Sequence, residues 1–188
     1  MTIELRRVSD DDWRTWRAVR LAALTDAPDA FASRQHEWAD ASEARWRGRL
    51  SIPGAMDLVA VDLDRNAPVG MVTGTPATDR SGSAELISLW VHPAVRHRGV
   101  ATLLITAIAR WAADTGAATL ALSVMLDNVA ARRTYERNGF TVPGPAAHGV
   151  CDAAGQLPGD NRELVMLRDL STERLEGTER TDGIEERG

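Results

Sequence analysis

The chain has 188 residues and a formal net charge of −5, with a pI of about 5.4, so a broad nucleic-acid-binding surface is not expected because such surfaces need excess Lys and Arg. No apolar run approaches the roughly 20 residues of a membrane span, and the amino terminus lacks the apolar core of a signal peptide. We therefore expect no nucleic-acid partner, no membrane partner and a cytoplasmic location. Cys151 is the only cysteine, so an intrachain disulfide is impossible, and no Cys and His group has the spacing of a zinc site.

The size of the chain favours one globular domain over residues 1–170. Residues 4–8 read as a short strand, and Ser9 with the acids that follow it predicts the start of a helix that continues to about Leu24. Within that helix Trp13, Trp16, Val19, Arg20 and Leu24 recur at three- and four-residue steps, a pattern that predicts a core-facing side. Pro28 ends this element, and a second helix is expected over residues 33–50.

Alternating polarity and turn residues predict a meander of three antiparallel strands over residues 57–64, 69–75 and 84–91. The period then changes to that of a helix, from Ala101 to Gly116, which is followed by a strand over residues 117–124. This strand, helix and strand form a βαβ unit whose strands should be parallel. A helix over residues 128–138 and a final strand over residues 162–170 complete an α/β (α+β) fold, with a mixed, mostly antiparallel central sheet flanked by helices.

Two further segments lack the pattern of a regular element. The stretch 143–160 is rich in Gly, Pro and Ala, which predicts a mobile loop. The tail 171–188 carries charge without apolar periodicity and is expected to be disordered.

The sequence RHRGVA lies between a predicted strand and a predicted helix, where successive backbone N–H groups and the helix dipole favour an anion. Gly99 lets a phosphate approach the backbone. The Lys-Ser/Thr ending of a Walker A loop and the full GxGxxG of a dinucleotide fold are both missing, so nucleotide hydrolysis and NAD chemistry lose support. The alternative is an ordinary loop with a solvated basic patch.

These residues resemble the acetyl-CoA-binding motif of the GNAT superfamily, Arg/Gln-x-x-Gly-x-Gly/Ala. The stretch NVAARRTYERNGF, residues 128–140, resembles the second signature of the same superfamily, and together the two cover roughly residues 84–142. Two separated motifs in their expected structural contexts make the match specific. The resemblance implies the GNAT acyl-CoA N-acyltransferase fold, acetyl-CoA as the acetyl donor and no metal.

The resemblance also implies which residues bind the cofactor. The backbone from His97 to Ala101 would hold the pyrophosphate, Arg96 takes the family's Arg/Gln position, and the strand edge from Leu89 to Val91 would pair with the pantetheine arm. Asn128 would hydrogen-bond that arm, with a helix N-cap as its alternative role, and Arg132 and Arg133 would lie near the outer phosphate unless they are simply solvated. The full set of cofactor-binding candidates is Leu89, Trp90, Val91, Arg96, His97, Arg98, Gly99, Val100, Ala101, Asn128 and Arg132.

Two residues are candidates for the chemical steps. Glu85 lies eleven positions before Arg96, the spacing of the strand glutamate in several members of the superfamily, and it is the candidate general base, with an exposed edge residue as the alternative. Its strand parity is that of Ile87, Leu89 and Val91. Tyr135 matches the superfamily's helical tyrosine and is the candidate acid for the departing thiolate. The alternative is a partly buried tyrosine with a satisfied hydroxyl.

The leading hypothesis is acetyl transfer from acetyl-CoA to a primary amine of a small molecule, by direct transfer in a ternary complex. Cys151 lies in the predicted loop without a sequence-evident activating partner, so a covalent acyl-enzyme is not expected. A protein or peptide acetyltransferase and a catalytically idle acetyl-CoA-binding module are the alternatives. Trp38, Trp46 and Trp90 could line a site for either kind of acceptor, but large aromatic residues usually belong to a core or an interface, so no role is assigned to them. A homodimer is compatible with the sequence but has no signature in it.

Overall fold

The computed structural model describes residues 1–31, 33–76, 82–143 and 163–171. All but the first residue of the predicted loop at 143–160, Cys151 included, and nearly all of the predicted tail at 171–188 lie outside the described residues. The described part holds a six-stranded sheet in the order β1-β2-β3-β4-β5-β6. Its strands are β1 (Ile3–Val8), β2 (Met56–Asp62), β3 (Ala67–Thr75), β4 (Ser83–Val91), β5 (Thr119–Met125) and β6 (Glu163–Asp169).

All neighbouring strands pair antiparallel except β4 and β5, which are parallel and joined by a helix. The prediction of a mixed, mostly antiparallel sheet flanked by helices is therefore confirmed. The helices are α1 (Trp13–Asp26), α2 (Gln35–Ala39), α3 (Glu43–Arg49), α4 (Val100–Asp114) and α5 (Val129–Arg137).

The prediction of one helix over residues 33–50 is wrong, because this segment forms the two short helices α2 and α3. Ser42 caps the start of α3, and its side-chain oxygen accepts a hydrogen bond from the backbone N–H of Arg45 at 3.3 Å. A serine cap competes with continuation of the preceding helix and starts a new one. The break lets the chain turn across the sheet.

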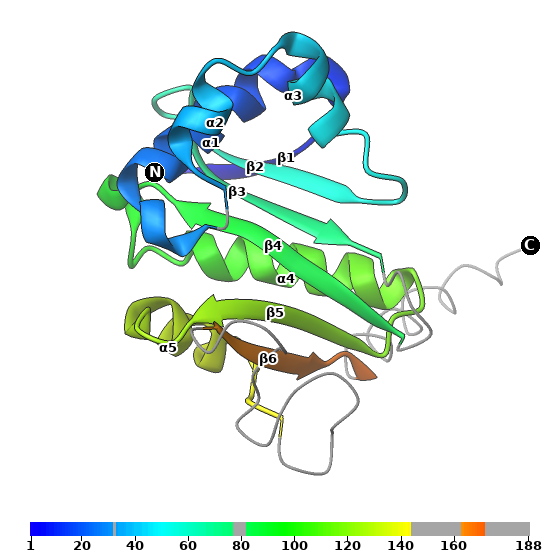
Figure 1. Cartoon of the computed structure of the whole chain (residues 1–188). Coiled ribbons are helices and arrows are strands. Elements are labelled where there is room, and N and C mark those ends of the chain that lie inside the picture. Colours follow the sequence, from blue (N-terminus) through cyan, green and yellow to red (C-terminus); the bar gives the residue numbers. More distant parts are fainter. Residues whose placement is uncertain (32, 77–81, 144–162, 172–188) are drawn as a thin grey trace, which may run out of the picture.

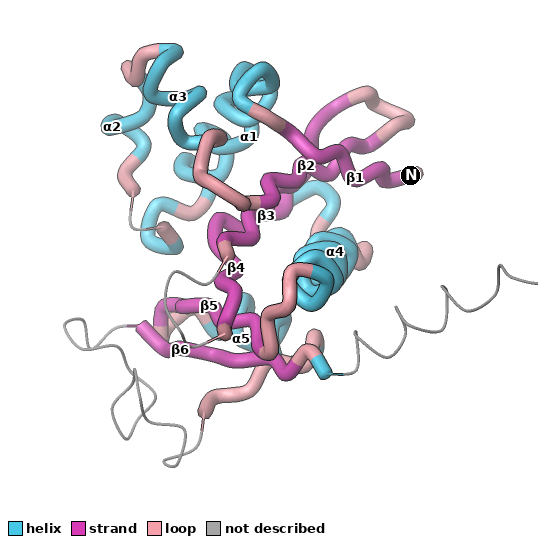
Figure 2. Tube along the Cα trace, turned by 90° about the vertical axis from the view of Figure 1, so that its right-hand side faces the viewer, coloured by secondary structure: helices cyan, strands magenta, loops and turns pink. Residues whose placement is uncertain are grey.

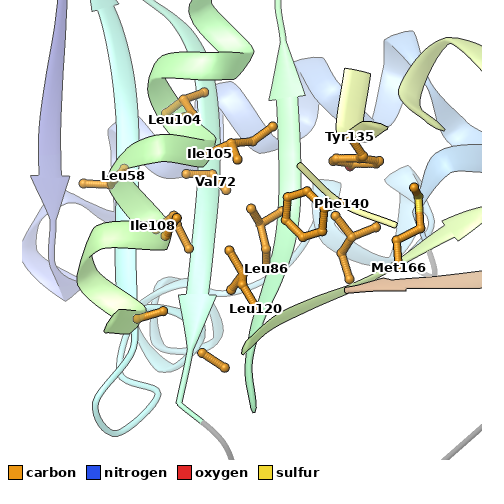
Figure 3. Close-up of a cluster of buried hydrophobic side chains, with 14 of the residues drawn as sticks. Leu58, Val72, Leu86, Leu104, Ile105, Ile108, Leu120, Tyr135, Phe140 and Met166 are labelled. Atoms are coloured by element: carbon orange, nitrogen blue, oxygen red, sulfur yellow. The ribbon is translucent and has the colours of Figure 1, made fainter. Parts of the chain in front are cut away.

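The helices form two layers on opposite faces of the sheet (Figures 1 and 2). Helices α1, α2 and α3 cover the face of β2 and β3 on one side, where Trp16 and Trp46 are fully buried against Val59 and Met71. Helix α4 covers the other face, where α5 also contributes Tyr135. The sheet thus separates two apolar cores, and the second of these is shown in Figure 3.

Helix α4 packs so closely on β3 that one strand position accepts only glycine. Along α4 the buried residues Leu104, Ile105 and Ile108 follow the helical period and face the sheet. A Cβ atom at Gly74 would lie 2.5 Å from Cζ3 of Trp111 and 3.0 Å from Cγ2 of Ile108. The first of these distances is far below van der Waals contact.

We therefore predict that Gly74→Ala lowers the free energy of unfolding by about 1–3 kcal/mol, the usual cost of overpacking a core. The matched control is Gly48→Ala in α3, where no atom lies within 4 Å of the added Cβ. That change should stabilise the protein by roughly 0.4–1 kcal/mol, because it restricts the unfolded chain without strain in the helix. Urea unfolding of both variants measures the contrast, and equal midpoints would contradict the packing.

Candidate functional site

Strand β4 carries a bulge that reverses which way its side chains face. The β3–β4 register shifts after Met71, and Ser88 has a φ of 60°, a left-handed conformation rare for a residue other than glycine. Before the bulge, Leu86 faces the core under α4; after it, Leu89 and Val91 pack against that core while Trp90 enters the core under α1. The predicted shared parity of Glu85 with Leu89 and Val91 is therefore wrong.

The sheet opens between β4 and β5. The two strands pair only through Ser83, Ala84 and Glu85 with Thr119, Leu120 and Ala121, and they then diverge toward their C-terminal ends (Figure 1). Among the described residues, no strand consequently pairs with the backbone of β4 beyond Glu85 on the β5 side. Parallel strands of a continuous sheet would leave no such edge.

The free edge of β4 presents the backbone of Leu89 and Val91. The N–H of His92 donates to the carbonyl of Val69 at 2.8 Å, and pairing alternates along an antiparallel ladder, so His92 and Trp90 face β3. Leu89 and Val91 then face the opening. Of the three residues predicted to form a pairing edge, Trp90 instead pairs with Met71 through its backbone and buries its indole.

A cleft of about 460 Å³ runs through this opening. It is bounded by β4, by side chains from α1 to α3 on one face of the sheet, and by α5 on the other. Among its lining residues are both predicted catalytic candidates and five residues that the sequence did not single out as site residues: Glu85, Tyr135, Arg20, Arg49, Ser88, Ser123 and Glu163. The indoles of Trp38 and Trp46 are in contact in a tilted arrangement, with ring centroids 4.6 Å apart and an interplanar angle of 51°, and they line the same cleft.

Glu85 lies at the exposed mouth of the cleft, next to the point where β4 and β5 part. Burial by the cleft walls raises the pKa of the Glu85 carboxyl, and the neighbouring negative charge of Glu163 raises it further. A raised carboxyl pKa makes protonation easier near neutral pH. It also makes this carboxylate a stronger base than an exposed glutamate.

Tyr135 reaches the cleft from α5 on the other side of the opening. Its ring packs edge to face against Phe140 with centroids 5.8 Å apart, within the core of Leu86, Leu120 and Met166 (Figure 3). Burial raises the pKa of the Tyr135 hydroxyl to about 12. None of the hydrogen bonds of the described residues involves that hydroxyl. The alternative, in which the hydroxyl is hydrogen-bonded within the protein, therefore has no support from these residues.

The start of α4 forms a cradle of backbone donors. In the described part of the chain, none of the N–H groups of residues 97–102 donates a hydrogen bond to a protein acceptor. His97 and Gly99 have φ values of 62° and 81°, and such an alternation of conformations turns successive N–H groups toward one point. The side chain of Val100 is buried in the core. The turn therefore offers its backbone to a ligand, at the positive end of the helix dipole.

Arg96 differs from residues 97–102 because both its side chain and its backbone N–H are hydrogen-bonded within the protein. Its guanidinium donates to the carboxylate of Asp26 and, at 3.0 Å, to the carbonyl of Val91. Asp26 also accepts a hydrogen bond from the Trp90 indole at 2.9 Å. Arg96 thus ties the end of β4 to the end of α1 and holds the turn in place, and its backbone N–H donates to Pro93.

The remaining cofactor candidates lie on α5 and in the turn. Asn128 caps α5, its side-chain oxygen accepting from the N–H of Ala131 at 3.1 Å. Arg132 donates to the carbonyl of Leu126 at 3.3 Å, which holds its guanidinium against the end of β5. In the part of the chain that the structure describes, the exposed side chain of Arg98 makes only a long contact with the sulfur of Met1.

Arg20 and Arg49 are the residues that sequence reasoning missed most clearly. The helical period places Arg20 on the apolar side of α1. Its charge is the signal for a site residue, because it interrupts the buried positions Trp16, Val19 and Leu24. Arg49 is the last residue of α3, and no sequence pattern around it indicates a site residue. Its place in the cleft depends on the break between α2 and α3.

Comparison with known proteins identifies the family. The model of the acetyltransferase (GNAT) family matches residues 8–140, so the chain belongs to this family of acyltransferases. A search of curated proteins found no match.

Solved structures share the fold at low sequence identity. The PaiA N-acetyltransferase of Thermoplasma acidophilum, in complex with coenzyme A, is 19% identical with a TM-score of 0.67, over 90% of this chain and 99% of that one. A chimera of the Vibrio cholerae spermidine N-acetyltransferase and hSSAT is 16% identical (TM-score 0.63, 92% and 98% covered). An Escherichia coli enzyme named for acetylating the alanine of a ribosomal protein is 16% identical (TM-score 0.61, 90% and 95% covered).

The described residues contain no helix with the length and apolar character of a membrane span. They also contain no group of three His, Cys, Asp or Glu side chains arranged to hold a metal ion.

The donor cradle yields a prediction about coenzyme A. At both Gly99 and Gly116 φ is positive, at 81° and 91°, and open space surrounds an added Cβ. Alanine at either position should cost about 1–2 kcal/mol of stability through backbone strain alone. Only Gly99→Ala, at the start of α4, should also weaken coenzyme A binding, by about tenfold, because relaxation of the turn misdirects its N–H groups.

Isothermal titration with coenzyme A measures this difference, with Gly116→Ala at the far end of α4 as the matched control. Equal affinities of the two variants would contradict a cradle at residues 97–102.

Proposed function

We propose that the protein transfers the acetyl group of acetyl-CoA to a primary amine of a small molecule, directly within a ternary complex. The observation that carries the proposal is an interrupted run of backbone donors: Leu89 and Val91 at the free edge of β4 and then residues 97–102, beyond the paired N–H groups of His92, Ala94, Val95 and Arg96. This run ends at the cleft that holds Glu85 and Tyr135. An extended arm that ends in a pyrophosphate has the shape and charge that such a run accepts.

The residues present fit coenzyme A at both ends of that run. Leu89 and Val91 offer N–H groups to an amide-bearing arm, and the turn at residues 97–102 offers six to an anion. The side-chain amide nitrogen of Asn128 donates to no other described residue and suits a further contact to the arm. Acetyl-CoA supplies an acetyl thioester, and the remaining work falls to groups of this chain.

Glu85 removes a proton from the attacking amine. An amine with a pKa near 10.4 costs roughly 4.6 kcal/mol to deprotonate at pH 7. The raised pKa of Glu85 brings this carboxylate closer to the operating pH, which is where a general base acts best. The amine nitrogen then bonds to the acetyl carbon as the bond from that carbon to sulfur breaks.

Tyr135 supplies a proton to the departing sulfur. With a hydroxyl pKa of about 12 and a thiol pKa near 8.5, transfer to a fully hydrated thiolate is uphill by about 5 kcal/mol. A thiolate in the cleft loses part of its hydration, which raises the pKa of the thiol and brings it closer to that of the Tyr135 hydroxyl. One proton of the ammonium group leaves through Glu85 before the attack, and the second, released from the nitrogen as the amide forms, restores the tyrosine.

The cleft favours a small acceptor over a protein. Its volume of about 460 Å³ lies in the range of small-molecule sites, and helices α1 to α3 cover it on one face of the sheet. The fold by itself does not distinguish a small-molecule acceptor from a protein acceptor, since the similar structures include an enzyme named for spermidine and one named for a ribosomal protein. A protein acceptor remains the second candidate.

The direct experiment is acetyl-CoA-dependent release of free thiol with a panel of small amines and lysine peptides, against a reaction without acceptor. Turnover with small amines supports the proposal, and turnover confined to peptides supports the second candidate. Thiol release that never exceeds the control, in a protein that binds coenzyme A, would mean an idle binding module.

The general-base role predicts the effect of Glu85→Gln. This variant should lose about 10²–10⁴-fold in kcat/KM. In the wild type, kcat/KM should fall as the pH drops through the raised pKa of Glu85, because protonation removes the base, and this acid limb should vanish in the variant. Glu136→Gln, an exposed glutamate on α5, is the matched control; a variant profile with an unchanged acid limb would rule out Glu85 as the base.

The acid role predicts a separate effect of Tyr135→Phe. The ring and its contact with Phe140 remain, so the melting temperature should stay within a few degrees of the wild type. The value of kcat should fall by about 10²-fold or more, the usual contribution of a positioned acid. Calorimetry measures the melting temperature, and rapid-quench kinetics measures the fall in kcat. A variant with full kcat would exclude the hydroxyl from the reaction.

A further inference from the structure

Two arginines face β4 across the cleft, and both point toward the bulge. Nη1 of Arg20, from α1, and Nη2 of Arg49, from α3, each lie 3.5 Å from Oγ of Ser88. All three residues line the cleft, on the face covered by α1 to α3. The bulge itself aims the serine, because its left-handed backbone breaks the alternation of β4.

Within the described ranges, only one of the two guanidinium groups has a carboxylate partner. Arg49 lies 3.4 Å from Oδ1 of the buried Asp57 and donates to Oγ1 of Thr73 at 2.8 Å. Arg20 has no carboxylate within ion-pair distance in the described part of the chain, and its guanidinium instead stacks over the ring of Phe31 at 4.4 Å. Burial lowers the pKa of Arg20 to about 10, and the like charge of Arg49 contributes.

As far as the described residues go, the positive charge of Arg20 is therefore not balanced by a carboxylate, although this side chain is largely shielded from water. Burial of an unpaired charge is unfavourable, and a bound anion of single charge would remove the imbalance. A carboxylate meets that description better than a phosphate dianion, and its two oxygens match the planar fork of a guanidinium. The serine hydroxyl adds a third donor to the same point.

The cleft has the opposite charge at its other end. Glu85 lies where β4 and β5 part. Glu163, at the start of β6, lines the same cleft and is close enough to Glu85 for their charges to interact. Glu85 precedes Ser88 by three residues, or roughly 10 Å of strand. An amine is attracted to the acidic end and an anion to the basic end. The two ends therefore match a molecule that carries both groups.

We propose that Arg20, with Arg49 and Ser88, binds a carboxylate of the acceptor, so that the acceptor class is amines that also carry a carboxylate, as amino acids do. This inference rests on the proposed acetyl transfer for its reaction, but the binding of the carboxylate is a property of the cleft alone. Arg20 is then a specificity residue. It contacts the carboxylate of the acceptor and not the nitrogen that reacts.

The test compares matched acceptors that differ in the carboxylate: lysine with cadaverine, and ε-aminocaproate and γ-aminobutyrate with alkylamines of equal length. The wild type should favour at least one carboxylate-bearing member by about tenfold or more in kcat/KM, the scale of a charged hydrogen bond. Arg20→Gln should raise KM for that acceptor by about tenfold to a hundredfold with kcat little changed, and should abolish the preference. Arg20→Lys should restore part of it.

The matched control is Arg14→Gln, an exposed arginine of the same helix that stacks on Trp13. A merely structural role for Arg20 would lower the activity toward both members of each pair equally. An unchanged preference in Arg20→Gln, or a wild type that favours the amines without a carboxylate, would overturn the inference and leave acetyl transfer intact.

A binding measurement separates this inference from the proposed function. Trp38 and Trp46 line the cleft, so their fluorescence follows titration with the matched acceptors in the presence of coenzyme A without any turnover. Tighter binding of the carboxylate-bearing members to the wild type than to Arg20→Gln supports the anion subsite even if no acceptor is acetylated. Equal binding by both proteins overturns it.

Discussion

The early end of the pairing between β4 and β5 is the constraint on which the rest of the site depends. Three residue pairs join the two strands, and the bulge at Ser88 then turns β4 away. A complete ladder would satisfy the N–H groups of Leu89 and Val91 and would close the sheet between Glu85 and Tyr135. The opening leaves those donors free and lets side chains from both faces of the sheet meet in one cleft.

Two networks hold the opening in shape. At the end of β4, Asp26 accepts from Trp90 and Arg96, which fixes the start of the donor turn against α1. In the middle, the buried Asp57 accepts from Thr73 at 2.5 Å and pairs with Arg49, which fixes the last residue of α3 over the sheet. Buried polar groups are favourable only when they are paired, so each network ties a helix to one position on the sheet.

The sequence predicted the parts of the site that local pattern determines. Gly99 between a strand and a helix indicated the donor turn, and the paired motifs placed Glu85 and Tyr135, which the structure brings to one cleft. It did not predict the bulge, since Ser88 is an ordinary residue by composition and its left-handed backbone depends on tertiary packing. Because the bulge was not predicted, Glu85 was wrongly expected to share a face of β4 with Leu89 and Val91. Arg20 and Arg49 were missed because their roles arise only when α1 and α3 pack over the opened strand.

The central claim is that the free edge of β4 and the turn after it form one binding surface for coenzyme A. Hydrogen–deuterium exchange with and without coenzyme A tests this amide by amide. The predicted result is slower exchange at Leu89, Val91 and residues 97–102 on binding, with little change at Trp90, whose backbone already pairs with Met71. Binding of coenzyme A without slower exchange at those amides would contradict the claim.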